Sequence, residues 1–116
     1  LEAINERKSE GNTSERALHY IVSIAQSNEK KFLGKSDDMV KEHYGVWKDN
    51  EYIAFYPHQL KSFLTKGDFS YSSIIRSWSD KGWIKKSKDE LAFRIKYDNK
   101  TLRVILINWE ALKNLL

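Results

Sequence analysis

Two apolar-patterned stretches lie so close together that few connections between them are possible. After Pro57, apolar residues recur at helical spacing as far as Lys66, and proline suits the first turn of a helix because its missing amide costs nothing there. A second stretch begins at the cap-like Ser70, so only residues 67–69 separate the two. This spacing predicts a helix-turn-helix.

The second of these helices is expected to be sharply two-sided. Its apolar face is predicted to consist of Tyr71, Ile74, Ile75 and Trp78. Its outward face is predicted to carry Ser72, Ser73, Arg76, Ser77 and Asp80. Gly82 follows as the left-handed residue that commonly ends a helix, and the chain is then expected to turn back onto the core.

A longer helix is predicted upstream. Asn12 and Glu15 have the spacing of a capping box, so we expect the helix to begin there. An apolar stripe follows, formed by Ala17, Leu18, Ile21, Val22, Ile24 and Ala25, and Phe32 and Leu33 lie near the expected helix end before Gly34. We therefore divide the chain into residues 1–11, a linker or helical lead-in, and residues 12–116, one folded domain.

Two β-hairpins are predicted from aromatic, β-branched and alternating patterns. Residues 44–47 and 52–55 flank a turn-like segment, and residues 91–96 and 102–107 flank the turn 98–100. Residues 35–43 show no clear period and are interpreted as a connector, in which Ser36, Asp37 and Asp38 are able to cap a short helical turn. Residues 109–116 resemble a short closing helix.

These elements follow one another in a recognisable order: helix, β-hairpin, two helices, second hairpin and short C-terminal helix. The order predicts an α+β fold, a winged helix-turn-helix in which the second hairpin is the wing. In such a fold the second helix of the pair fits a DNA major groove, and the hairpin reaches along the backbone. We therefore expect the unit from Phe69 to Arg103 to contact nucleic acid.

The charge distribution agrees with this expectation. Residues 1–56 hold eight Lys and Arg against ten Asp and Glu, whereas residues 57–103 hold eleven against five, as expected when one face meets a polyanion. The predicted nucleic-acid-binding residues are Ser72, Ser73, Arg76, Ser77, Lys81, Lys85, Lys86, Lys88, Arg94, Lys96, Lys100 and Arg103. Arg76 alone on the helix suits bidentate recognition, so charge is expected to carry affinity, with low sequence specificity.

Several other classes of protein are disfavoured. The chain has no cysteine, its three histidines are too scattered for a metal motif, and no Gly-rich phosphate loop or nucleophile elbow is present. We expect no catalytic residues, no metal and no cofactor. No stretch is apolar enough to span a membrane, so we expect a cytoplasmic domain without a membrane partner. The start at Leu1 suggests a domain of a longer protein.

Other interpretations of the same residues stay open. The tryptophans Trp47, Trp78, Trp83 and Trp109 either pack in the core or stack on single-stranded bases. Arg76 has a possible ion-pair partner in Asp80, four residues on, and cations on the wing can simply protect an exposed sheet edge. The domain could instead dock on a protein without contacting DNA, or act as a transcriptional regulator. No long dimerising helix is visible, so we expect a monomer.

A family resemblance covers residues 13–109. It is carried by the segments Tyr44-Gly45-Val46-Trp47, Tyr52-Ile53-Ala54-Phe55, Asp68-Phe69, Asp80-Lys81-Gly82-Trp83-Ile84 and Arg103-Val104-Ile105-Leu106. With these segments the chain resembles the C-terminal winged-helix domain of MCM-like AAA+ replicative helicases from bacterial mobile genetic elements. The resemblance implies a non-catalytic accessory domain that follows an ATPase core, engages duplex or forked DNA or regulates the motor, and has its own AAA+ motor as a partner.

Overall fold

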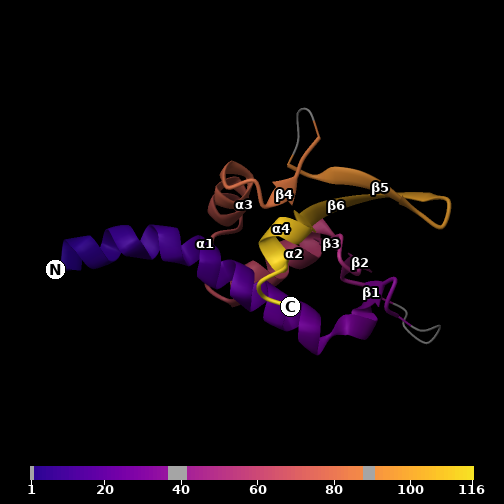
Figure 1. The fold of residues 1–116 in the computed structure, drawn as a ribbon, viewed down its shortest axis with the longest axis horizontal. Helices are drawn as coiled ribbons and strands as arrows, with labels where there is room; N and C mark the ends of the chain where they lie inside the picture. The colour runs from indigo at the N-terminus through magenta and orange to yellow at the C-terminus, as the bar shows by residue number, and fades with distance from the viewer. Residues whose placement is uncertain (1, 37–41, 88–90) are drawn as a thin grey trace.

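The first helix begins well upstream of its expected cap. The computed structural model describes residues 2–36, 42–87 and 91–116. For residues 2–12 it describes the backbone only. Helix α1 (Glu2–Ser27) is continuous through residue 12, and its first half projects from the rest of the molecule (Figure 1). The prediction that a helix begins at the Asn12–Glu15 capping box is therefore wrong, because backbone amides inside a continuous helix need no capping side chain.

The end of the first helix also differs from the expectation. After α1 comes a 3-10 turn, η1 (Glu29–Lys31), and then a strand, β1 (Phe32–Leu33). Phe32 is fully buried, with its ring edge-on to Trp47 and Phe55 at centroid distances of 5.8 and 5.2 Å. This aromatic packing draws residues 32 and 33 into the sheet, so they do not belong to the helix. The cap predicted at residues 37 and 38 lies outside the described residues.

Both predicted hairpins are confirmed. The first is formed by β2 (Gly45–Lys48) and β3 (Tyr52–Phe55), and the second by β5 (Phe93–Tyr97) and β6 (Lys100–Asn108). With β4 (Ile84–Lys85), the described strands form a sheet in the order β1-β2-β3-β6-β4, and β5 extends it along β6. Gly45 is required at the β2–β3 contact, since a Cβ there would lie 1.8 Å from the carbonyl oxygen of Ala54.

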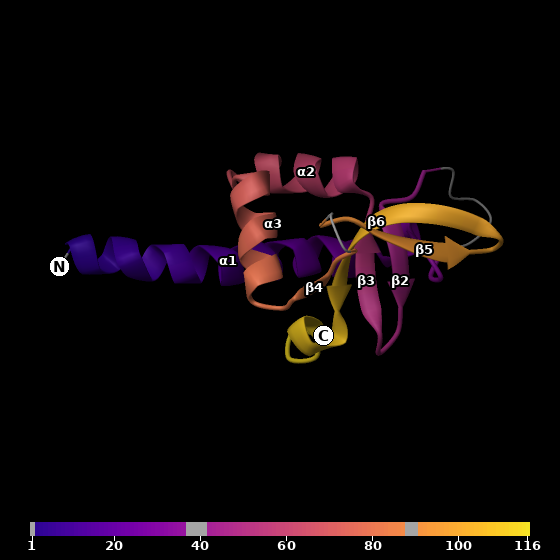
Figure 2. The ribbon, with the colours of Figure 1, turned by 90° about the horizontal axis from the view of Figure 1, so that it is seen from above.

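The helix-turn-helix is confirmed as well. Helices α2 (Pro57–Lys66) and α3 (Tyr71–Asp80) are joined by a short turn in which Asp68 adopts a positive φ of 67°. The main core is shared by α1, α2, α3 and one sheet face, and its fully or nearly fully buried members include Ala17, Leu18, Ile21, Val22, Leu60, Leu64, Ile74, Ile75 and Trp78. Figure 2 shows α2 and α3 beside α1, with the strands to one side.

Helices α1 and α3 are joined by buried polar contacts. The indole Nε1 of Trp78 donates a hydrogen bond of 3.0 Å to the backbone carbonyl of Ser14, and the hydroxyls of Ser14 and Ser77 are hydrogen bonded. Trp78 is completely buried and Trp47 is only 7% exposed. The core-packing interpretation is therefore confirmed for these two tryptophans, whereas Trp83 and Trp109 are half-buried.

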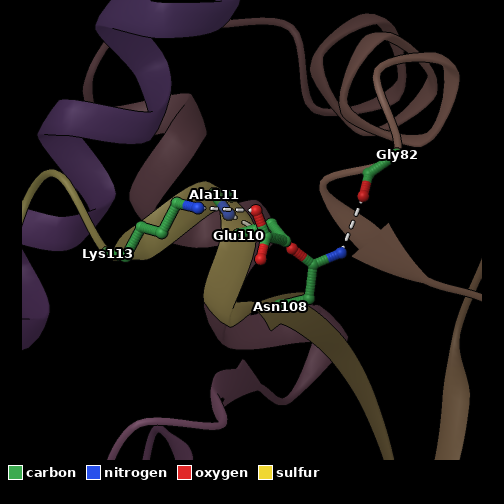
Figure 3. Close-up of polar contacts among 5 residues, drawn as sticks. All are labelled: Gly82, Asn108, Glu110, Ala111 and Lys113. Atoms are coloured by element: carbon green, nitrogen blue, oxygen red, sulfur yellow. Dashed lines mark hydrogen bonds and ion pairs between the residues drawn. The ribbon is translucent and has the colours of Figure 1, made fainter.

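The C-terminal segment fixes the base of the wing relative to α3. Asn108 caps the short helix α4 (Trp109–Leu112), because its Oδ1 accepts a 3.2 Å hydrogen bond from the amide of Ala111. Its Nδ2 donates to the carbonyl of Gly82 at 2.7 Å, and an ion pair of 2.8 Å joins Glu110 to Lys113 (Figure 3). The end of β6 is thereby fastened to the turn after α3, where Gly82 has a positive φ of 75° as expected.

Candidate nucleic-acid interface

Helix α3 presents a polar face because its apolar face is fully used in the core. Ile74, Ile75 and Trp78 are buried, whereas Ser72, Ser73 and Arg76 are exposed. This is the outcome expected from the helical spacing of the apolar residues. Within the described residues, Arg76 forms no ion pair with Asp80. Arg76 is exposed on the outward side of the helix.

The register of the wing determines which cations share a face. Asp98 and Asn99 have φ values of 51° and 66°, as in a tight two-residue hairpin turn. This turn places Arg94 directly opposite Arg103 across the two strands, and directly opposite residues point to the same face of a sheet. Both arginines are exposed, so they form a basic pair on one face of the wing.

This basic face adjoins the outward face of α3. Between α3 and the base of the wing lies an open hollow of about 350 Å³, which Ser72, Arg76 and Arg103 all line. Apolar residues form the rest of its lining, namely Pro57, Tyr71, Ile75, Leu91, Ala92 and Ile105. Predicted site residues that are far apart in the sequence are thus gathered into one surface, which we call the α3–wing face: Ser72, Ser73, Arg76, Arg94 and Arg103.

Tyr71 is a member of this hollow that the sequence analysis assigned only to the core. Burial raises the pKa of its phenol, and the charge of the nearby Arg103 acts in the opposite direction. The phenol therefore stays protonated at neutral pH and can donate a hydrogen bond. Its position at the first turn of α3, beside a wing arginine, becomes evident only when the helix and the wing are placed together.

The remaining predicted residues lie elsewhere. Ser77 is half-buried and its hydroxyl bonds to Ser14. By contrast, Ser73 stays on the α3–wing face, where it accepts a 3.2 Å hydrogen bond from the Ser70 hydroxyl. Lys81 lies over the ring of Trp83, with its Nζ 5.5 Å from the centroid. Lys86 is exposed just after β4. Lys88 lies outside the described residues.

Lys85 and Lys100 are separated from the α3–wing face. Lys100 pairs with Tyr97, so it points to the face opposite the Arg94–Arg103 pair. Lys85 lies on that opposite face too, with its Nζ 4.8 Å from the centroid of the Phe93 ring. Lys96 follows Arg94 by two residues and so lies on the same face of the wing, and nearer the tip it also lines a hollow. The expectation of one basic wing face thus holds for Arg94, Lys96 and Arg103, not for Lys100.

Two further findings concern the described residues as a whole. No group of three or more His, Asp or Glu side chains among them is arranged to hold a metal ion. None of their helices is long and apolar enough to cross a lipid bilayer.

A helix-turn-helix followed by a hairpin wing defines a winged-helix domain, and the α+β architecture of the described residues has this form. Residues 12–111 match the family of the Cch helix turn helix domain, so the chain belongs to that family. No curated protein matches the chain.

Proposed function

We propose that this domain binds DNA through the α3–wing face. The observation that carries the proposal is the gathering of Arg76 and Arg103 around one hollow between α3 and the wing, with Arg94 directly opposite Arg103. Guanidinium groups bind phosphate oxygens bidentately and are also suited to the guanine edge. Membership of a helix-turn-helix family supports nucleic acid as the partner.

The geometry suits a duplex. An α-helix fits the major groove, and the outward face of α3 carries small serines that allow the helix backbone to come close to the DNA. The wing then lies along the neighbouring phosphates, where Arg94 and Arg103 make contacts that do not depend on the base. Arg76 is the only long hydrogen-bonding side chain that we assign to base edges, so we expect affinity with little sequence specificity.

We further propose that the domain is the non-catalytic C-terminal part of an MCM-like AAA+ replicative helicase from a bacterial mobile element. The segments that resemble this class lie in the hairpins, in the turn between α2 and α3 and in the turn after α3, and the sequence contains no phosphate-binding loop. In this role the domain holds the DNA while the partner motor, on the same polypeptide, hydrolyses ATP.

Binding of a fluorescent duplex, followed by anisotropy over a salt series, tests the proposal. If Arg94, Arg103 and one further lysine each neutralise a phosphate, the logarithm of the binding constant should fall against the logarithm of salt concentration with a slope of about −3. No duplex binding at low salt would contradict the proposal. That result would favour the alternative, a winged helix that docks on its own ATPase or on a replication partner.

A further inference from the structure

The sheet has a second face that none of the described helices covers. A separate apolar cluster lies there, built on Ala54, Val104 and Leu106, with Tyr52, Tyr56, Phe93, Ile95 and Leu102 packed around it. All of these residues come from β3, β5 and β6, except Tyr56 at the start of α2. The three central residues are buried by the partly exposed side chains around them, so those aromatic and aliphatic side chains form the surface of this face.

The cluster opens into a groove between the wing and the first hairpin. The wing and β2 extend on the same side of the molecule (Figure 1), and an open hollow of about 300 Å³ lies where they approach. Tyr52 of β3 and Tyr97 at the wing tip both line it, as do Lys48 and Lys96. Two half-buried aromatic rings and two lysines therefore share one concave surface.

Positive charge predominates around this groove. Its one carboxylate, that of Asp49, is paired with the Nζ of Lys35 at 2.6 Å, and the Nζ of Lys48 is paired with Glu51 at 3.0 Å, so among the described lysines of the lining Lys96 adds the unbalanced positive charge. Lys96 lines the groove, while Lys85 and Lys100 lie on the same sheet face as the apolar cluster. The surface as a whole is thus complementary to an anionic backbone.

Tyr52 carries no charge at neutral pH. Burial raises the pKa of the Tyr52 phenol, Lys48 opposes the shift, and Glu51 and Tyr97 add to it. Tyr52 and Tyr97 line the same hollow, so the two phenols lie near one another. A protonated phenol does not repel phosphates, and its ring offers a flat apolar surface.

We propose that this groove binds single-stranded DNA, with Tyr52 and Tyr97 stacking on unpaired bases and the neighbouring lysines contacting the backbone. Aromatic rings in a basic groove are the usual means of holding a single strand, because every unpaired base exposes a flat face. The bases of a duplex are stacked on one another, so the same rings cannot insert without unpairing them. The inference rests on DNA being the partner, as proposed above. It gives the wing two ligands, a duplex on the α3–wing face and a single strand on the opposite face.

The test compares two probes: a labelled oligothymidylate of about 12 nucleotides and the labelled duplex. For Tyr52→Ala/Tyr97→Ala we expect the oligothymidylate affinity to fall by about tenfold or more, since stacking on each base is lost, and the duplex affinity to stay within about twofold. Tyr52→Phe/Tyr97→Phe keeps both rings and should retain the wild-type affinity for both probes. Tyr97→Ala alone, at the wing tip, provides a milder variant whose folding is checked by circular dichroism.

The outcomes separate this inference from the proposed function. Unchanged oligothymidylate binding by a folded Tyr97→Ala and by the double alanine variant would overturn the groove assignment, even if the duplex still binds. A loss as large in the phenylalanine variant as in the alanine variant would overturn stacking as the mechanism. Tyrosine-dependent oligothymidylate binding without duplex binding would support the groove while contradicting the α3–wing face. Binding of neither probe would overturn both.

Discussion

Trp78→Ala is expected to lower the free energy of unfolding by about 3–5 kcal/mol, as large aromatic deletions in cores do. Trp78 is completely buried, and its indole also donates the hydrogen bond to the Ser14 carbonyl that ties α3 to α1. The truncation removes this donor and leaves a cavity between the two helices. A domain of this size has about 5–15 kcal/mol of stability in total, so the variant should unfold at much lower urea concentration, as measured by circular dichroism.

Ser72→Ala is the matched control for this prediction. Ser72 lies on the same helix but is exposed, so its removal should change the free energy of unfolding by no more than about 0.5 kcal/mol. A loss below about 1 kcal/mol for Trp78→Ala would show that α3 is not anchored to α1 through this residue. The orientation of the α3–wing face would then need another explanation.

Arg76→Glu/Arg94→Glu is expected to weaken duplex binding by about 100-fold, or about tenfold for each reversed contact, which is about 1.4 kcal/mol each. Each substitution removes a guanidinium from the α3–wing face and places a carboxylate against the phosphates. Both arginines are exposed, so stability should change little. Anisotropy with the labelled duplex measures the effect at one fixed salt concentration, because affinity for DNA depends strongly on salt.

Lys30→Glu/Lys113→Glu changes the net charge by the same amount at distant exposed positions, in η1 and after α4. If binding depends on local contacts, this control should lose far less affinity than the arginine variant. Equal losses in the two variants would mean that the overall charge of the domain attracts DNA and that no particular face binds it.

The helix-turn-helix and the wing could be predicted because local patterns determine them. The three-residue interval before Ser70 and the apolar spacing of α3 are properties of short segments, and each is confirmed. The turn at Asp98 and Asn99 is also local. Signals of this kind do not depend on what packs against the segment.

The errors arise where tertiary packing overrides a local signal. The Asn12–Glu15 spacing is a valid capping pattern, but the chain before it is helical too, so the cap has no free amides to satisfy. Phe32 was assigned to a helix end because it lies near the apolar stripe. Its burial among the rings of Trp47 and Phe55 takes it into a strand instead, and both rings come from later parts of the chain.

The candidate site was only partly predictable for the same reason. Helical spacing alone could not distinguish Ser77, which bonds to Ser14 across the α1–α3 contact, from Ser72, which is exposed. The face of each wing cation depends on the hairpin register, and one residue of shift moves a side chain to the opposite face. Tyr52 was predicted as a strand residue and Tyr97 was not assigned, and their meeting in one groove follows from the way the wing approaches the first hairpin.

The most direct test of DNA binding through the α3–wing face is an amide chemical-shift titration of the labelled domain with a short duplex. The largest shifts are predicted in α3, at residues 71–80, and along the wing at Arg94 and Arg103. Smaller shifts are expected in α1 and α4, which lie away from this face. Shifts confined to α1, η1 and α4, or no shifts at a duplex concentration that saturates binding, would contradict the account.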